Sequence, residues 1–306
     1  MATVSGSATV GGVSFPVSAA VTLPSAAAPP PPSGSSQCYF GVWDDGSGYP
    51  SDGVSYSWAG VEKFAAAKVL SATYYMSWLA PFPTGLNNLA KQNGATLYLN
   101  LEPQNPWGGG ANPSMSDIAA GKYDASYLAP LGNAIKAGGH NVLLTFAHEM
   151  NGSWYPWGSG AITPAQWVAA WKHVYTTVKA AAGGLASFAW CPNNNDVGPV
   201  TPYWPGQAFC DQAAFDGYLN TTSSSQTFSS FIAPTVAEIR KLTSGSVWNA
   251  ETGVLGTNRE ARITAFVNDM HAAGLLGFTQ FNEGDYLLDA SETSALTAAV
   301  NAWNAS

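Results

Sequence analysis

The sequence predicts an α/β protein built on a (β/α)8 TIM barrel, which a short β-hairpin and a proline-rich linker precede. Three observations predict it. The length of 306 residues suits one such barrel with a small appendage. From Cys38 onward, apolar β-rich runs alternate with helix-like segments, as in a parallel barrel. Finally, acidic residues stand where several of the β-rich runs end, which is where such barrels carry their chemistry.

Eight β-rich runs are the candidate barrel strands. They cover residues 38–43, 69–78, 96–102, 141–149, 186–191, 211–218, 246–251 and 275–282. The segments between them show apolar and small residues at helical spacing. The clearest helix begins at Thr163-Pro164 and ends at Gly183-Gly184, which are favourable residues for the two ends of a helix.

The N-terminal region precedes the barrel and has a different composition. Residues 2–10 and 13–22 alternate small or apolar with polar residues around Gly11-Gly12, which predicts a β-hairpin. Residues 24–36 contain a proline run with serines, which favours an extended spacer. The expected domains are a hairpin at 1–23, a Pro/Ser-rich linker at 24–37 and a catalytic barrel at 38–306.

Composition narrows the class of partner. With a net charge of −8 and only 10% charged residues, the chain has little means of binding phosphate backbones, so we expect no nucleic acid. No run approaches the roughly 20 apolar residues of a membrane span, and no signal-peptide pattern opens the chain. The 12 tryptophans and 13 tyrosines are typical of a sugar-binding cleft as well as of an aromatic core.

Carboxylates are scarce in this sequence, yet four candidate strands end in one. Glu102, Glu149, Glu251 and Glu283 close the third, fourth, seventh and eighth strands. The sequence argues against a zinc helix after the fourth strand, because Gly152 stands where a second histidine is required. No strand ends in a G-x-S-x-G elbow, which disfavours a serine nucleophile. The three cysteines match no zinc motif, and the sequence leaves open whether Cys191 and Cys210 are bridged.

Two facing carboxylates suit the cleavage of a glycosidic bond, in which one donates a proton and the other attacks or stabilises the sugar carbon. Glu149 and Glu251 form the expected pair, because the fourth and seventh strands lie on opposite sides of an eight-stranded barrel. Burial against Trp154 or Trp157, with repulsion from Glu251, should keep Glu149 protonated. We expect no metal and no cofactor.

The motifs "HEMNGSWYPWG" at 148–158 and "AETG" at 250–253 resemble those of glycoside hydrolase family 26, within clan A of retaining β-glycanases. The resemblance implies Glu149 as acid/base and Glu251 as nucleophile in a double displacement. It also implies that His148 and Trp154 shape the subsite at the cleavage point and that Tyr218 hydrogen-bonds the nucleophile. Asp216 shares a strand face with Tyr218, so we expect it to orient a site hydroxyl or His148.

The sequence also departs from that family. Thr145 stands where the family has an arginine, four residues before the acid/base. The strand ends where sugar contacts are expected carry Trp78, Gln280, Asn282 and Glu283. Glu102 and the Trp107 loop would serve a glucan cleft equally well. The substrate is therefore left open between β-1,4-mannan and mixed-linkage β-1,3-1,4-glucan, with β-1,3-xylan as a further alternative within the family.

Three readings of the whole chain follow. The first is an endo-acting β-glycanase whose partner is a β-linked polysaccharide, extracellular or at the cell surface. The second is a catalytically inactive barrel that binds glycans. The third adds to the first: the hairpin attaches a polysaccharide depolymerase to a larger assembly, such as a cell surface or a phage tail, which makes a virion tail an alternative location.

Overall fold

A computed structural model describes residues 2–10, 13–21, 37–44, 59–105, 111–221 and 226–306. The N-terminal strands β1 (Ala2–Val10) and β2 (Val13–Val21) pair antiparallel, from Ala2 opposite Val21 to Val10 opposite Val13. This confirms the predicted hairpin. Its Gly11-Gly12 turn and the proline run of the linker lie outside the described residues.

Eight parallel strands close into a barrel, with β10 hydrogen-bonded to β3, as the sequence predicted. The strands are β3 (Tyr39–Asp44), β4 (Ser71–Ser77), β5 (Thr96–Glu102), β6 (Val142–Phe146), β7 (Ala186–Trp190), β8 (Gln212–Asp216), β9 (Val247–Thr252) and β10 (Gly277–Asn282). Each predicted strand is present, and most ends shift by one or two residues. The largest difference is in β6, which was expected to run to residue 149 and ends at Phe146.

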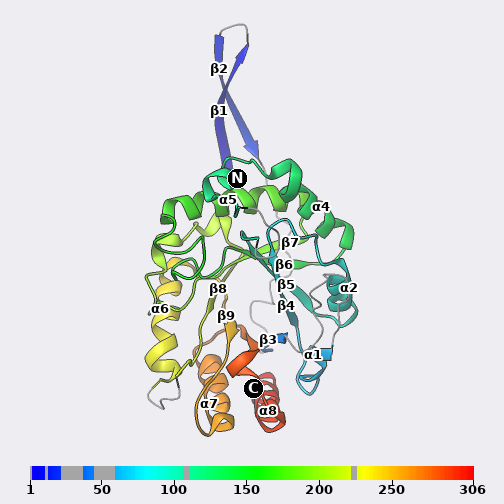
Figure 1. Cartoon of the computed structure of the whole chain (residues 1–306), viewed down its shortest axis with the longest axis vertical. Helices are drawn as coiled ribbons and strands as arrows, with labels where there is room; N and C mark the ends of the chain where they lie inside the picture. Colours follow the sequence, from blue (N-terminus) through cyan, green and yellow to red (C-terminus); the bar gives the residue numbers. More distant parts are fainter. Residues whose placement is uncertain (1, 11–12, 22–36, 45–58, 106–110, 222–225) are drawn as a thin grey trace.

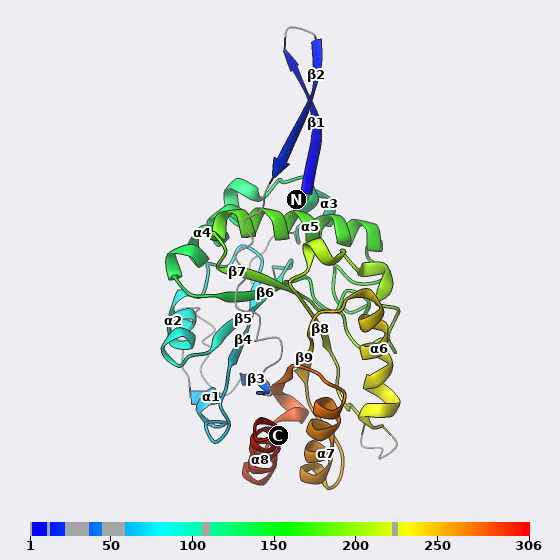
Figure 2. The same ribbon diagram turned by 180° about the vertical axis from the view of Figure 1, so that it is seen from behind.

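Helices lie outside the strands and surround them (Figures 1 and 2). They are α1 (Ala59–Glu62), α2 (Thr84–Gln92), α3 (Met115–Ala119), α4 (Ala129–Gly138), α5 (Pro164–Ala182), α6 (Ala233–Leu242), α7 (Arg259–Ala272) and α8 (Ala290–Asn304). None of the helices in the described ranges combines the length and apolar character needed to cross a bilayer.

Helix α5 has the predicted ends. Thr163 accepts a hydrogen bond from the backbone N–H of Gln166 while the Gln166 side chain accepts from Thr163, which is a capping box. Pro164 occupies the first turn, where no backbone donor is needed. Gly183 ends the helix at φ 63°, a conformation that glycine adopts without steric cost.

The core has two parts. Side chains from most strands fill the barrel itself, namely Tyr39, Tyr98, Leu143, Ala189, Cys191, Ala214, Trp248 and Ala250. A larger apolar layer packs between the strands and the surrounding helices. The barrel is thus a packed core rather than a pore, and ligands must bind at its mouth. All three cysteines are buried as free thiols, so Cys191 and Cys210 are not bridged.

Strand β9 contains one extra residue just before Glu251. Phe215 of β8 pairs with Asn249 and the next residue, Asp216, pairs with Glu251, so Ala250 is left over. The register against β10 shifts at the same place. Without this bulge Glu251 would face the helices, because Ala250 points into the barrel. The bulge redirects the carboxylate to the mouth of the barrel.

The division into hairpin, linker and barrel remains a prediction, and a deletion tests it. Removing residues 1–36 should leave hydrolysis per mole of protein unchanged, because the barrel closes with its own eight strands. The measurement is specific activity on any glycan that the full chain cleaves, with circular dichroism to show that the barrel is folded. A folded but inactive deletion variant would contradict the proposed boundary.

Candidate active site

Glu149 stands on an unusual stretch of backbone directly after β6. Ala147 and Glu149 have φ values of 51° and 54°, in the left-handed region that ordinary residues avoid. Such a conformation costs roughly 1–3 kcal/mol per residue and is found mainly at functional sites. It explains why β6 stops at Phe146, three residues before the end that the sequence predicted.

Neighbouring groups hold this backbone in place. The N–H of Ala147 donates to Leu101 O of β5 (3.0 Å), and the N–H of Glu149 donates to Cys191 O after β7 (2.8 Å). Two buried indoles donate to backbone carbonyls of the same turn: Trp157 to His148 O (2.7 Å) and Trp167 to Ala147 O (3.0 Å). The tryptophan-rich sequence after β6 therefore builds the support of the site.

The Glu149 carboxyl is 7% exposed and accepts two hydrogen bonds. The Trp154 indole donates to Oε2 at 2.7 Å, and the Asn193 amide donates to Oε1. Burial, followed by repulsion from Glu251, raises the pKa of Glu149 to about 8, although both hydrogen bonds oppose the shift. The group therefore holds a proton at neutral pH.

Glu251 has a different set of partners. The Tyr218 hydroxyl donates to Oε1 and the Tyr75 hydroxyl donates to Oε2. Burial raises the pKa of Glu251, and the two phenols act against that rise because they stabilise the anion. The charge of Glu251 contributes to the raised pKa of Glu149, and the two phenols make Glu251 the better site for a negative charge.

Hydrogen bonds from two side chains of β9 to the backbone of Gly217 hold Tyr218 next to Glu251. The buried Asn249 amide accepts from Gly217 N (3.2 Å) and donates to Gly217 O (2.9 Å). Thr252 also donates to Gly217 O, at 2.6 Å. Asn249 and Thr252 lie on either side of the bulge in β9. Their hydrogen bonds therefore join the irregular part of β9 to Gly217, the residue before Tyr218.

His148 and Asp216 lie beneath this pair. His148 is 1% exposed, and burial lowers its pKa to about 3, so the imidazole is neutral. The ring contacts Tyr75 and Tyr155, and the Tyr155 hydroxyl is 3.2 Å from Nε2. Asp216 is 2% exposed and accepts from the Cys191 thiol at 3.2 Å. Burial, then repulsion by Glu251 and Glu149, raises the pKa of Asp216 well above its ordinary value.

A metal ion has one candidate set of ligands in the described part of the chain. Atoms of His148, Asp216 and Glu251 lie within 4.8 Å of one another. Both oxygens of Glu251 already accept phenol hydrogen bonds, and Asp216 accepts a thiol. These contacts describe a hydrogen-bonded acid cluster, and the absence of a metal requirement stays a prediction.

Glu102 and Glu283 belong to the same charged mouth. Burial raises the pKa of Glu102 to about 7, against a hydrogen bond from Gln104, with a smaller rise from Glu251. Glu283 accepts from the Trp43 indole at 2.8 Å and its charge raises the pKa of Glu251. The mouth is therefore rich in carboxyls, as the strand ends in the sequence suggested.

Other expected sugar contacts lie apart from the catalytic pair. Trp78 is 3% exposed and packs against Tyr123, Tyr127 and Phe146 in the layer between strands and helices. Asn282 is 1% exposed; its amide donates to Asp44 at 2.6 Å and its carbonyl accepts from Leu288 N.

Gln280 is a further expected contact, and its side chain binds the backbone. Gln280 is 3% exposed and donates to Phe281 O at 3.0 Å. Trp107 lies outside the described residues.

Sequence reasoning missed three residues of the site: Tyr75, Asn193 and Tyr155. Asn193 follows the end of β7, so the strand-end rule that found the carboxylates would have found it if applied to amides. Tyr75 lies inside β4 on the same face as Thr73 and Ser77, and its alternation alone gives no sign that it reaches a carboxylate. Tyr155 belongs to the motif after Glu149 but was passed over in favour of Trp154.

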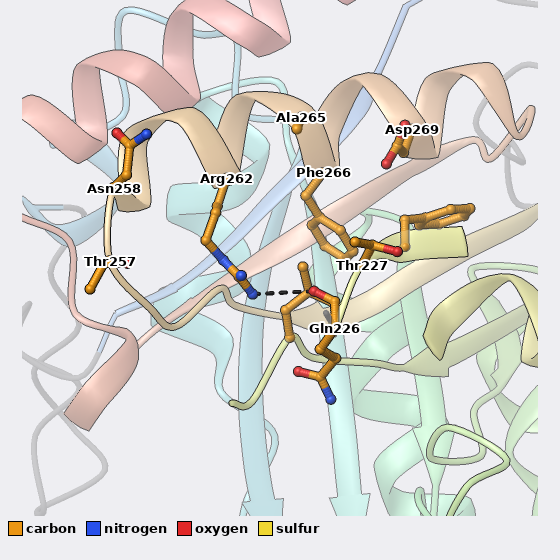
Figure 3. A pocket seen from close by; sticks show the side chains of 10 residues that line it. Gln226, Thr227, Thr257, Asn258, Arg262, Ala265, Phe266 and Asp269 are labelled. Atoms are coloured by element: carbon orange, nitrogen blue, oxygen red, sulfur yellow. Dashed lines mark hydrogen bonds between the residues drawn. The ribbon is translucent and has the colours of Figure 1, made fainter. Parts of the chain in front are cut away.

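A separate hollow of about 310 Å³ lies beside α7, and its lining includes none of the carboxyls described above (Figure 3). Phe266 and Arg262 of α7 face it, and the Arg262 guanidinium donates to Gln226 O at 3.3 Å. Leu219 connects this hollow to the site, because it follows Tyr218 in the chain. No group with catalytic chemistry described above lines it.

A closed (β/α)8 barrel with a buried and a half-buried glutamate at its mouth, each held by its own hydrogen-bond donors, is an arrangement that suits the cleavage of a glycosidic bond. The family model for glycosyl hydrolase family 26 matches residues 123–253, a stretch that contains both glutamates. That segment of the chain is therefore similar to glycoside hydrolase family 26.

Individual proteins show further similarity to this chain. Endoglucanase H of Acetivibrio thermocellus is 32% identical over 151 residues, which is 46% of this chain; the match spans only 15% of the length of that relative. A family 26 β-mannanase from Bacteroides ovatus superposes with a TM-score of 0.62 at 13% identity, covering 88% of this chain and 90% of the other. A modular endo-β-1,4-mannanase from Cellulomonas fimi gives 0.63 at 16% identity, covering 86% and 70%. At these identities the two structures show the fold alone.

Proposed function

We propose that the chain is an endo-acting β-glycanase that works by double displacement with retention of configuration, with Glu149 as acid/base and Glu251 as nucleophile. The observation that carries this proposal is the asymmetry of the pair. Glu149 is buried with a pKa raised to about 8, whereas Glu251 accepts a phenol on each oxygen.

In the first step, Glu149 donates its proton to the glycosidic oxygen while a Glu251 oxygen attacks the anomeric carbon. The bond to the leaving sugar breaks, its electron pair takes the proton, and a covalent glycosyl-enzyme forms. Trp154 and Asn193 receive the negative charge that then appears on Glu149, because both already donate to its oxygens.

In the second step, Glu149 acts as a base. It takes a proton from water while the water oxygen attacks the anomeric carbon, and the ester bond to Glu251 breaks with its electron pair returning to the carboxylate. The change in the role of Glu149 follows the change in charge of its partner. Once Glu251 is esterified, the repulsion that raised the pKa of Glu149 is gone, so Glu149 gives up a proton more easily in the intermediate.

The substrate class we propose is β-1,4-mannan or mixed-linkage β-1,3-1,4-glucan. Support comes from the names of similar proteins, two β-mannanases and an endoglucanase. The half-exposed Trp154 offers an aromatic face next to Glu149 on which a sugar ring can stack. We further propose that the protein acts outside the cell or at a cell surface, and that the hairpin attaches it to a larger assembly. A virion tail is the alternative location.

A panel of polysaccharides tests the function. Purified protein would be assayed for new reducing ends on mannan, mixed-linkage glucan, β-1,3-xylan and cell-wall polysaccharide. Hydrolysis of one of the first two with a rapid fall in viscosity is the expected result, because endo cleavage shortens chains before it releases many ends. Binding without hydrolysis would instead identify an inactive glycan-binding barrel.

The stereochemistry of the first product is a prediction of the proposed mechanism. Two inversions at one carbon retain the configuration, so a β-linked substrate should release a β-anomer first. Proton NMR of the anomeric signals during the first minutes of hydrolysis measures it, before mutarotation mixes the anomers. An initial α-anomer would show direct attack by water and would exclude Glu251 as the nucleophile.

A further inference from the structure

Tyr75 lies on β4, within the barrel wall, and its hydroxyl reaches Glu251 from the side opposite to Tyr218. The hydroxyl of Tyr75 donates to Oε2 of Glu251, while Tyr218 donates to Oε1. Burial, then the negative charge of Glu251, raises the pKa of Tyr75, so the phenol keeps its proton and remains a donor. Each oxygen of the nucleophile therefore has its own donor.

The ring of Tyr75 is held on three sides. Trp43 packs edge-on at a centroid distance of 5.0 Å, Phe281 lies at 6.4 Å and His148 at 5.8 Å. A side chain fixed in this way loses little conformational entropy when its hydroxyl binds a carboxylate. The contact is therefore preorganised and does not depend on substrate binding.

Positive charge is missing from this part of the described structure. No lysine or arginine of the described residues forms an ion pair with Glu149, Asp216 or Glu251. Thr145 of β6, the residue four positions before Glu149, is buried and has a hydroxyl without a hydrogen-bond partner among the described residues. An anion at Glu251 must then be stabilised by hydrogen bonds alone, and the two phenols are the donors in contact with it.

We propose, on the basis of the function proposed above, that Tyr75 is a second catalytic phenol that shares with Tyr218 the role of a cation in stabilising Glu251 as an anion. The attack on the sugar uses one oxygen of Glu251 and turns the other into the ester carbonyl. Because each oxygen has a phenol, the carbonyl oxygen keeps a donor whichever oxygen attacks. When water later displaces the ester, the electron pair returns to a carboxylate that both phenols already face, and neither phenol transfers its proton.

Tyr75→Phe tests this proposal, with Tyr74→Phe as the matched control. Tyr74 is the next residue on the same strand, but it packs against the outer apolar core. On the glycan that the wild-type protein cleaves best, Tyr75→Phe should lower kcat by roughly 10-fold to 100-fold, the range for a lost hydrogen bond to a charged group, with KM nearly unchanged. The control should keep the wild-type kcat.

The pH profile separates a catalytic role from a structural one. Loss of a donor to the anion raises the pKa of Glu251, so the acid limb of kcat/KM should move to higher pH by about one to two units in Tyr75→Phe. A loss of activity through misfolding would lower the whole profile without moving its limb. An unmoved limb in a folded variant would overturn the proposal.

A second measurement is independent of turnover. Carbon NMR of glutamate labelled at the side-chain carboxyl follows the titration of Glu251 directly, with Glu251→Gln to assign its signal and Glu149→Gln as the background that removes the coupled group. The midpoint should rise in Tyr75→Phe and stay in place in Tyr74→Phe. An equal titration midpoint of Glu251 in the two variants would refute the role of Tyr75. Failure of the wild-type protein to cleave any glycan would refute the proposed function, but the titration of Glu251 could still be measured.

Discussion

Replacing Glu251 with glutamine is expected to lower turnover on the best glycan by about four orders of magnitude or more, because the amide neither attacks the anomeric carbon nor carries the negative charge that stabilises the cation-like sugar. The fold should persist. Glutamine has nearly the same shape, and the substitution removes a carboxylate that repels Glu149 and Asp216. Initial rates of reducing-end release, with circular dichroism on the same samples, measure both expectations.

A matched control makes the same chemical change elsewhere. Glu260→Gln lies on α7, where the carboxylate accepts from Ser291 at 3.0 Å, and it should retain wild-type activity. A second control uses chemistry: Glu251→Ala with sodium azide and an activated aryl β-glycoside should form the α-glycosyl azide, because azide enters from the face that the nucleophile has vacated. Retention of a tenth of wild-type activity in Glu251→Gln would show that this group is not the nucleophile.

The second large effect is expected for Glu149→Gln, and it should depend on the leaving group. On a polysaccharide the loss should be roughly 100-fold to 10,000-fold, the usual contribution of general acid–base catalysis. On a dinitrophenyl β-glycoside the first step should stay fast, because that leaving group departs without a proton, and the glycosyl-enzyme should accumulate as a burst. Equal losses on both substrates would contradict a proton-donor role for Glu149.

The pH profile of the wild-type protein follows from the same group. Burial and repulsion raise the pKa of Glu149 to about 8, so the proton needed for the first step is present below that value and is lost as the pH rises through it. The alkaline limb of kcat/KM should therefore lie near pH 8. That limb should disappear in Glu149→Gln, whose amide does not titrate in this range.

The sequence predicted the fold and the presence of Glu149 and Glu251 at the mouth of the barrel, because both depend on regular features. Eight alternating units specify a barrel, and carboxylates at strand ends are visible without coordinates. The parts that were missed depend on irregular backbone. The left-handed turn at Glu149 shortens β6, and no local signal in Ala147 or Glu149 announces a positive φ. The sequence analysis extended the strand to Glu149, whereas the hydrogen bonds from Trp157 and Trp167 hold residues 147 and 148 in the turn.

Side-chain partnerships were predicted less well than positions. Tyr218 was expected at the nucleophile and its hydroxyl lies there, but Tyr75 comes from a distant strand and its ring reaches the same carboxylate only through the closure of the barrel. Trp78 and Asn282 occupy strand ends that suggest the site, yet one packs outward and the other braces Asp44. Strand-end position therefore places a residue near the mouth of the barrel, but it determines neither the layer in which the side chain packs nor its partner.

The extra residue in β9 affects how the Glu251 segment could be transferred to another barrel protein. Up to Ala250, every second residue of the strand points into the packed interior. Strict alternation would then turn Glu251 toward the helices, but the extra residue reverses the alternation and Glu251 reaches the mouth of the barrel. A protein engineer who copies this glutamate onto a regular barrel strand at the same distance from its start would aim it at the wrong layer. The unit to transfer is the irregular segment together with Asn249 and Thr252, whose side chains brace it. A sequence alignment that omits the extra residue would misplace every later position of the strand.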